Sequence, residues 1–410
     1  MALLNKKLDL GFNFIYSQRP GVNGPSEIDH RPESLIWMLR TWDDHDYYYC
    51  EIFQGNAFKT FLIDTVVPAD ILEKIKTDKD TFLYICNTHE AFLDIVEPLY
   101  EALVIEAGIP ARKIYISNEA PDLAKEVRKY ADANGLEYMN VEWVLEFEYS
   151  ISWQANDLNL KGDNILKVKS YDKRYLNFNR RWRLHRPTFV ALLKAMNLLD
   201  KGYVSLAPSD DGRNWDNMWQ WIKDHHKHDV EFTNLFNKID NEMPLPPMYL
   251  DTDELVNNRA IFEDRSLSLY ENSLVSVVNE TTFYHGMNLN ESRFLSEKIF
   301  KPIAVGHPFI FVSAPKALEA LRTLGYKTFH PFIDETYDSQ FDNEMRMKKI
   351  LKEIERLCNM SNQQIVEFIR NVKPICEHNQ LLLRSKTYPF IAGQDPTHKL
   401  LHYHFVRRTL

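Results

Sequence analysis

Two kinds of hydrophobic pattern alternate along the first 150 residues of the chain. Continuous apolar runs are followed by stretches in which apolar residues recur every three or four positions, and two of these stretches end at a glycine. The runs predict strands at 81–87, 113–118 and 136–144, and the periodic stretches predict helices at 90–108 and 121–135. Strand, helix and strand in that order, joined by short loops, predict a doubly wound parallel sheet.

The same alternation resumes near residue 174, which predicts a second block of the same kind. Strands are expected at 174–180, 203–206, 273–280, 308–313 and 326–329, and helices at 187–202, 296–306, 315–325, 341–357 and 361–377. The predicted fold class is therefore α/β, with two Rossmann-like domains that face each other across a cleft. We place the domains at residues 1–165 and 166–385, with a tail at 386–410 that is free to cross back to the first domain.

Other parts of the sequence are less regular. The first 80 residues contain a strand at 11–16 and a hairpin around 47–64 in this interpretation. Residues 151–172 are polar and are expected to form a connector between the domains. Residues 209–229 are rich in tryptophan and aspartate and are expected to form an insertion.

Composition narrows the class of protein without identifying it. The 410 residues are enough for two ordinary domains, and the formal charge of −9 gives no general attraction to nucleic acid or anionic membranes. The four cysteines stand far apart without metal-ligand spacing, which favours free thiols in a reducing compartment. The sequence start has no signal-peptide pattern, and no apolar run reaches the ~18 residues of a membrane helix. We therefore expect a soluble, cytoplasmic protein.

The stretch NFNRRWRLHR is the densest basic run in the chain. Its basic residues lie at the carboxyl end of the strand predicted at 174–180 and lead into the helix that begins at Pro187, which is where open α/β sheets bind ligands. Guanidinium groups at such a place can bind phosphate oxygens with paired hydrogen bonds, although a solvated charge cluster is the simpler alternative. The basic residues of this run are Arg180, Arg181, Arg183, His185 and Arg186.

The stretch FLSEKIFKPIAVGHPFIFV predicts a short helix that runs into a buried strand. Ser296 is the expected N-cap, and Glu297, Lys298 and Lys301 occupy the first turn and a half. A carboxylate there can accept hydrogen bonds from a sugar diol while a lysine contacts a phosphate oxygen. Glu280 ends the preceding predicted strand and is expected at the same edge of the sheet. The alternative is an ordinary helix cap with surface lysines.

Together the two stretches resemble the donor-binding half of GT-B glycosyltransferases of phages, giant viruses and bacterial surface-sugar clusters. The pattern S-E-K is similar to the S/T-E-K motif of the α1,3-fucosyltransferase type, and the N-x-N-R-R-x-R-x-H-R block is similar to the start of that domain. The later patterns L-x-x-L-G-Y-K-T-F and F-I-D-E-T-Y-D extend the resemblance, which covers about residues 174–340.

The resemblance implies an acceptor-side first domain and a second domain that binds a UDP- or GDP-sugar. Glu297 would bind ribose or sugar hydroxyls, and Lys298 with Lys301 would contact the diphosphate. Such enzymes usually need no metal and no cofactor beyond the nucleotide-sugar, because basic groups stabilise the departing diphosphate. The implied reaction is a displacement with inversion onto a hydroxyl group. The arginines that complete the diphosphate site in this interpretation are Arg180, Arg181, Arg183 and Arg186.

The acceptor hydroxyl must also lose a proton, which requires a base in the first domain. Three places offer one: His89 and Glu90 after a predicted strand, Asp44 in TWDDHD, and Asp29 beside a glycine-rich loop. Each has a structural alternative, since Glu90 can simply begin a helix and aspartate-rich turns are common.

Other interpretations stay open at this point. Asp251 and Asp253 form a D-x-D triplet like the metal site of GT-A transferases, and the histidines at 224–229 could chelate a metal or belong to an exposed polar insertion. The acceptor could be a surface glycan or a hydroxymethylated DNA base, since basic residues gather at 161–186 and 398–410. A non-catalytic nucleotide- or nucleic-acid-binding protein is the alternative to an enzyme.

Overall fold

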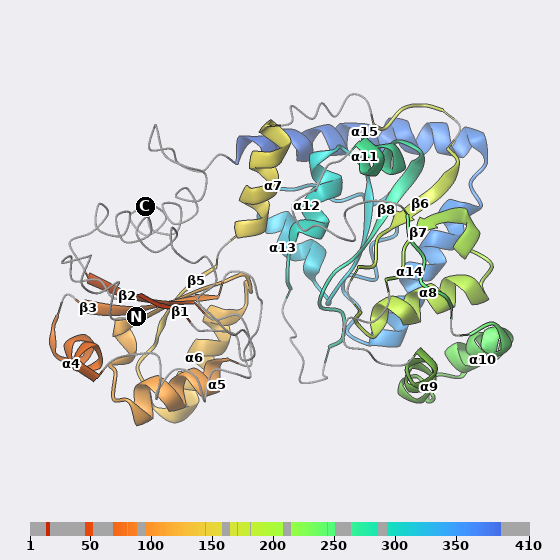
Figure 1. The fold of residues 1–410 in the computed structure, drawn as a ribbon. Helices are drawn as coiled ribbons and strands as arrows, with labels where there is room; N and C mark the ends of the chain where they lie inside the picture. The colour runs from red at the N-terminus through yellow and green to blue at the C-terminus, as the bar shows by residue number, and fades with distance from the viewer. Residues whose placement is uncertain are drawn as a thin grey trace. The chain divides into compact units, whose positions relative to one another are not determined.

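The structure is a computed structural model, and contacts within it divide the chain into two α/β units (Figure 1). The first unit takes in the described residues as far as Tyr149 together with Arg293, and the second contains the others from Ser150 to Lys386. Each unit holds one parallel sheet, so the α/β class with two Rossmann-like units is confirmed. The structure describes residues 14–16, 46–51, 69–79, 81–87, 95–143, 145–157, 165–169, 171–180, 182–207, 215–243, 245–250, 264–285 and 293–386.

In the first unit five parallel strands follow one another across the sheet in chain order. Because the order never reverses, right-handed crossovers place the connecting helices on one face, and Figure 1 shows α4, α5 and α6 there. These described strands therefore do not form the doubly wound arrangement expected for this block. The strands are β1 (Phe14–Tyr16), β2 (Asp46–Glu51), β3 (Thr81–Asn87), β4 (Ile114–Asn118) and β5 (Asn140–Trp143). The helices are α4 (Ala69–Thr77), α5 (Val96–Leu99), the π-helix Tyr100–Glu106 that continues it, a 3₁₀ turn (Ala111–Lys113) and α6 (Leu123–Asn134).

The hairpin expected around 47–64 is wrong. β2 pairs in parallel with β1 on one side and with β3 on the other, so both of its edges are occupied. The tyrosine run at 47–49 thus belongs to an inner strand. By contrast, the helix predicted to stop at Gly135 does so, because α6 ends there with a left-handed glycine at φ 64°.

In the second unit the strand order is β7-β6-β8-β9, and it reverses between β6 and β8. This reversal sends α8 and α12 to opposite sides of the sheet, as Figure 1 shows, and makes the gap between β6 and β8 a topological switch point. The strands are β6 (Lys173–Asn177), β7 (Gly202–Val204), β8 (Ser273–Asn279) and β9 (Phe309–Val312). The helices are α7 (Glu146–Asp157), which starts in the first unit, α8 (His185–Ala195), α9 (Trp215–His225), α10 (Val230–Ile239), α11 (Asp264–Glu271), α12 (Glu297–Ala304), α13 (Ala317–Thr323), α14 (Asn343–Cys358) and α15 (Asn362–Ser385), with 3₁₀ turns at Leu199–Lys201 and Asp240–Glu242.

Three expectations for the second block need correction. The polar connector expected at 151–172 begins with α7, whose Ser152 Oγ donates to the carbonyl of Lys386 at 3.0 Å. The insertion expected at 209–229 contains α9, which buries Trp219 and Ile222. Residues 326–329 form no strand, because the Asn379 side chain bonds both backbone groups of Lys327 at 2.8 Å and takes the place of a strand partner.

The predicted tail at 386–410 lies outside the described residues, apart from its first residue. Among the helices that are described, none combines the length and the apolar character needed to cross a membrane.

Gly202 at the start of β7 is required by close packing against β6. A Cβ added there would lie 2.3 Å from two ring carbons of Tyr175, whose side chain is fully buried and donates to the carbonyl of Leu198 at 2.9 Å. The ring therefore occupies the space that any other residue at 202 would need.

We expect Gly202→Ala to lower the free energy of unfolding by about 1–3 kcal/mol, the usual cost of overpacking a core. Urea unfolding measures this loss. The same substitution in a Tyr175→Leu background should cost clearly less, because the ring is gone. Equal losses in the two backgrounds would contradict the steric explanation.

Candidate functional site

Three asparagines mark the switch point of the second unit. Asn177 ends β6, Asn279 ends β8, and Asn179 lies between them, donating to Asn177 Oδ1 at 2.6 Å and accepting from Asn279 Nδ2 at 2.7 Å. All three are at most 1% exposed. Their amides hold the carboxyl ends of β6 and β8 together, at the place where open α/β sheets bind ligands.

Two polar atoms at this edge have no hydrogen-bond partner among the described residues. One is Asn279 Oδ1 at the end of β8, and the other is the hydroxyl of Ser313, directly after β9. Both side chains are about 2% exposed or less, and β8 and β9 are neighbours, with Asn279 opposite Val312. A buried acceptor and a buried hydroxyl without protein partners can be satisfied by a water or a ligand at the strand ends.

The carboxylate of Glu280, directly after β8, is fully buried and accepts from the start of α12. The Ser296 amide donates to Oε2 at 3.1 Å, the Ser296 hydroxyl lies 2.7 Å from Oε1, and the Thr281 amide donates at 2.7 Å. The ammonium group of Lys298 lies 3.3 Å from Oε1. We call Glu280, Thr281, Ser296 and Lys298 the Glu280 cluster. It fixes the N-terminus of α12 to the end of β8.

Ser296 is the N-cap of α12, as the sequence predicts, and its hydroxyl accepts from the Lys298 amide at 3.4 Å. Lys298 Nζ donates to Ser296 Oγ at 2.9 Å and to Thr281 Oγ1 at 3.3 Å besides Glu280. An ammonium group has three protons, and the three acceptors in the cluster and the Glu297 carboxylate at 3.1 Å already surround it. A phosphate oxygen that binds Lys298 must therefore displace one of these acceptors.

Glu297 is the more accessible acid of this edge. Its side chain is 30% exposed and its carboxylate lies 3.1 Å from Lys298 Nζ. Burial alone would raise the pKa of Glu297, but the charges of Lys298 and Lys301 outweigh it and lower the pKa to about 2. Glu297 is thus a permanent anion at neutral pH, able to accept hydrogen bonds from hydroxyl groups.

The basic run of the sequence reaches the same edge from α8. His185 Nε2 donates to the carbonyl of Glu280 at 2.9 Å, and Arg186 Nη2 donates to the carbonyls of Asn279 and Glu280 at 3.2 and 3.1 Å. Burial and the charge of Arg186 hold the pKa of His185 well below 6.5, so the ring is neutral. The two predicted clusters therefore meet at one residue, Glu280.

The other arginines differ in their exposure. Arg183 is exposed and donates to the Trp182 carbonyl at 3.3 Å, Arg180 is half-buried, and Arg186 is only 3% exposed. Arg181 lies outside the described residues. The arginine block therefore contains one buried residue that bonds to the strand end and at least two that lie nearer the surface.

The proposed bases and the alternative metal triplet are outside the part of the chain that the structure describes: His89, Glu90, Asp44, Asp29, Asp251 and Asp253. Sequence reasoning missed the asparagine triad, although the N-x-N spacing near the carboxyl end of the strand predicted at 174–180 was a signal for it. It also missed Glu119, a buried carboxyl directly after β4 in the first unit, where Asn118 Oδ1 accepts from the Ala120 amide at 2.6 Å.

Comparison with solved structures finds glycosyltransferases. An α,α-trehalose 6-phosphate synthase from Burkholderia multivorans is 12% identical with a TM-score of 0.43, over 92% of this chain and 73% of that one. An α,α-trehalose-phosphate synthase (UDP-forming) from Burkholderia vietnamiensis is 12% identical with a TM-score of 0.43, over 92% of this chain and 76% of that one. A glycosyltransferase from Rickettsia africae ESF-5 is 11% identical with a TM-score of 0.26, over 92% of this chain and 79% of that one. No protein-family model and no curated protein matches the sequence. Similarity at this level assigns no activity and no residue role to the chain.

We expect Glu280→Ala to lower the free energy of unfolding by about 3–5 kcal/mol, because it leaves Lys298 and the Ser296 amide without their buried acceptor. Urea unfolding measures the loss. Glu355→Ala, which removes an exposed glutamate of α14, is the control and should stay within about 0.5 kcal/mol of wild type. Similar losses in both variants would show that the Glu280 cluster does not stabilise the unit.

The lowered pKa of Glu297 predicts a pH dependence of stability. A carboxyl whose pKa falls from 4.5 to about 2 on folding stabilises the protein above 4.5 and loses that contribution as the pH falls toward 2. We expect wild type to be more stable than Glu297→Gln at neutral pH, and the difference to shrink across this acidic range. Urea midpoints of both proteins in a pH series test it, and a difference that does not change with pH would contradict it.

Proposed function

We propose that the chain is a glycosyltransferase that moves a sugar from a UDP- or GDP-sugar to a hydroxyl group. The second unit binds the donor at its switch point, and the first unit provides the acceptor side. The observation that carries the proposal is the meeting of the S-E-K helix start and the arginine block at Glu280, beside strand ends that hold two unsatisfied buried polar atoms.

The chemistry of this edge suits a nucleotide-sugar. Glu297 is ionised and partly exposed, so it can accept hydrogen bonds from a ribose or sugar diol. Lys298, Lys301 and the arginines Arg180, Arg181 and Arg183 supply the positive charge that a diphosphate needs. Arg186 supports this edge from beneath through its bonds to strand-end carbonyls.

In the proposed reaction the acceptor oxygen forms a bond to the anomeric carbon while the bond from that carbon to the diphosphate oxygen breaks. The diphosphate leaves with the electron pair, and the lysines and arginines neutralise the added charge without a metal ion. The acceptor proton passes to a base, for which His89, Glu90, Asp44 and Asp29 remain the candidates. Attack from the face opposite the leaving group inverts the anomeric configuration.

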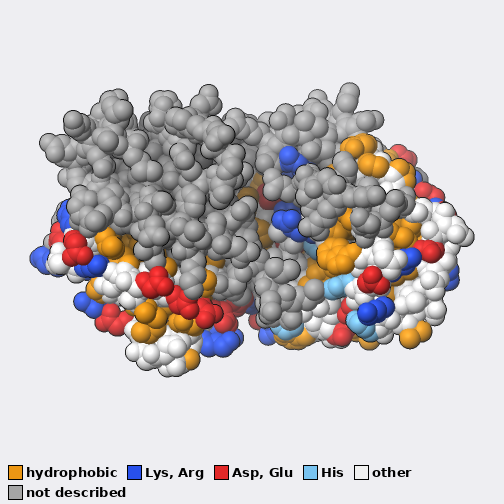
Figure 2. All heavy atoms as spheres, turned by 60° about the horizontal axis from the view of Figure 1, so that its bottom comes forward, with side chains coloured by type: hydrophobic (Ala, Val, Ile, Leu, Met, Phe, Trp, Pro, Cys, Tyr) orange, Lys and Arg blue, Asp and Glu red, His pale blue; other side chains and the backbone are white. Residues whose placement is uncertain are grey.

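We propose a glycan as the acceptor in preference to a hydroxymethylated DNA base. DNA binding needs an extended basic surface, and among the described residues of the second unit on the face that Figure 2 shows, acidic and basic side chains are interspersed with apolar ones. The formal charge of −9 also disfavours a polyanion. Salt-sensitive binding to duplex DNA would reverse this preference. The proposed place of action is the cytoplasm, that of the host if the protein comes from a phage.

Two rivals make different predictions. A nucleotide-binding protein without a catalytic base would bind UDP or GDP and leave a nucleotide-sugar intact. A GT-A-like enzyme that uses Asp251 and Asp253 would lose its transfer activity in EDTA, whereas the proposed donor site needs no metal for the reaction.

We expect UDP or GDP to raise the melting temperature of the wild-type protein, and Glu297→Ala and Lys298→Ala to weaken that binding about tenfold or more. The rate at which the two variants release the nucleoside diphosphate from a nucleotide-sugar should fall as well. A thermal-shift titration and a diphosphate-release assay measure the two effects.

The matched controls are Lys373→Ala and Glu377→Ala, which break an exposed lysine–glutamate pair on α15 with a 3.8 Å separation. They should bind the nucleotide like wild type. Unchanged binding in the Glu297 and Lys298 variants would remove both residues from the donor site.

A further inference from the structure

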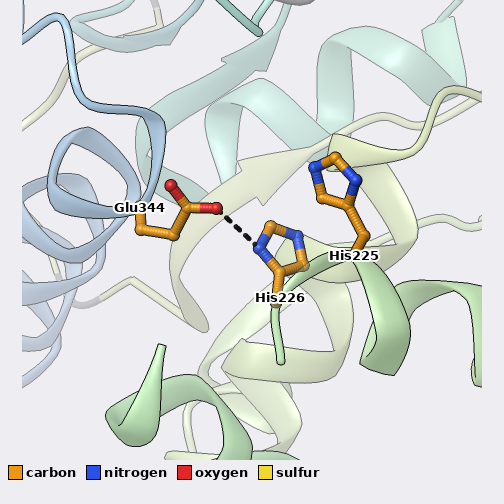
Figure 3. Close-up of side chains that lie close together, drawn as sticks. All are labelled: His225, His226 and Glu344. Atoms are coloured by element: carbon orange, nitrogen blue, oxygen red, sulfur yellow. Dashed lines mark hydrogen bonds and ion pairs between the residues drawn. The ribbon is translucent and has the colours of Figure 1, made fainter. Parts of the chain in front are cut away.

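Two neighbouring histidines and a glutamate converge in the second unit, in a region that the donor-site proposal does not use. His225 ends α9, His226 follows it, and Glu344 lies in the first turn of α14 (Figure 3). One ligand atom from each side chain lies within 4.8 Å of the other two. We call these three residues the histidine–glutamate cluster.

His226 is the buried centre of this cluster, which corrects the view that the histidines at 224–229 belong to an exposed insertion. Its side chain is 2% exposed, and its ring packs edge-on against Phe232 of α10 with centroids 5.3 Å apart. Its Nδ1 faces Glu344 Oε1 at 3.0 Å, and its Nε2 lies 3.5 Å from the hydroxyl of Tyr284. Both ring nitrogens therefore have defined directions.

His225 adds a second imidazole, which takes no part in the hydrogen bond between His226 and Glu344. Its ring stands at 83° to that of His226, with centroids 4.7 Å apart. It is half-buried, as is Glu344, so solvent reaches part of both side chains.

We propose that His225, His226 and Glu344 bind a divalent transition-metal ion, with Zn²⁺ as the favoured ion and a solvent molecule as its fourth ligand. Two imidazoles and one carboxylate form a His₂Glu ligand set that Zn²⁺ adopts in proteins. Ligand atoms around tetrahedral zinc lie about 3.3 Å apart, so the side chains need to draw in from their present spread of up to 4.8 Å.

Its surroundings fit a metal that joins two parts of the unit. The Tyr284 hydroxyl lies where it can accept a hydrogen bond from Nε2 of His226 while Nδ1 binds the ion, as the outer partner of a metal-bound histidine does. Lys348, one turn further along α14, already binds Asp229 at 2.6 Å at the start of α10. The ion would strengthen the connection between the α9–α10 segment and α14, which the His226–Glu344 hydrogen bond and the pairs of Lys348 with Asp229 and Glu231 already make. This inference does not depend on the proposed function.

The test is a titration of the full chain, purified without a metal-chelating tag and stripped of metal, with ZnCl₂ and separately with CoCl₂. We expect one strongly bound Zn²⁺ per chain, a higher melting temperature with Zn²⁺ than with Mg²⁺, and the intense visible absorption of tetrahedral Co²⁺. His225→Ala and Glu344→Gln should each weaken zinc binding about 100-fold and abolish that absorption.

His228→Ala is the matched control, because it removes an exposed histidine three residues further along the chain and should leave binding unchanged. Circular dichroism without metal checks that each variant keeps its fold. A wild-type protein that binds no zinc stoichiometrically would overturn the proposal. So would zinc binding that persists undiminished in the His225→Ala and Glu344→Gln double variant.

Discussion

A buried carboxylate is stable only when hydrogen-bond donors surround it. In the second unit the buried carboxylate is that of Glu280, where the end of β8 meets the starts of α8 and α12. Its carboxylate accepts hydrogen bonds from the amide and hydroxyl of Ser296 and forms an ion pair with Lys298, both at the start of α12. The main-chain carbonyl of Glu280 accepts hydrogen bonds from the side chains of His185 and Arg186, at the start of α8. α8 and α12 lie on opposite faces of the sheet, so one residue after β8 ties both helix starts to the switch point. The proposed donor site is therefore built on a rigid base.

The parts of the fold that the sequence predicted well are those whose signal is local. β3 and α12 were predicted almost to the residue, because an apolar run, an N-cap serine and a glycine stop are all written within a short stretch. What failed depends on distant partners. The parallel neighbours of β2 come from elsewhere in the chain, and the backbone of Lys327 is satisfied by Asn379, a residue on α15. No local pattern records such partners.

The site shows the same division. Strand ends of a parallel sheet share one edge, so the sequence could bring Glu280, the arginine block and the S-E-K helix to one place. The sequence could not predict which arginine and lysine side chains are buried and bond to the strand ends. Arg186 donates to the carbonyls of Asn279 and Glu280, and Lys298 donates to the carboxylate of Glu280, so these two cations satisfy buried acceptors at the strand end. Accessibility, which separates a binding group from a supporting one, is a property of the packed structure.

The segment that follows β8 connects the two sites proposed in this unit. Glu280 begins it, and Tyr284, four residues on, faces His226 of the histidine–glutamate cluster. Between them Phe283 stacks on His185 with centroids 5.4 Å apart and lies under the guanidinium of Arg346 from α14, which also bonds the Phe283 carbonyl. Residues 280–284 are thus held by α8, α12, α14 and the end of α9 at once. A metal ion at the histidine–glutamate cluster would therefore bind beside one end of this segment, and the proposed donor would bind beside the other.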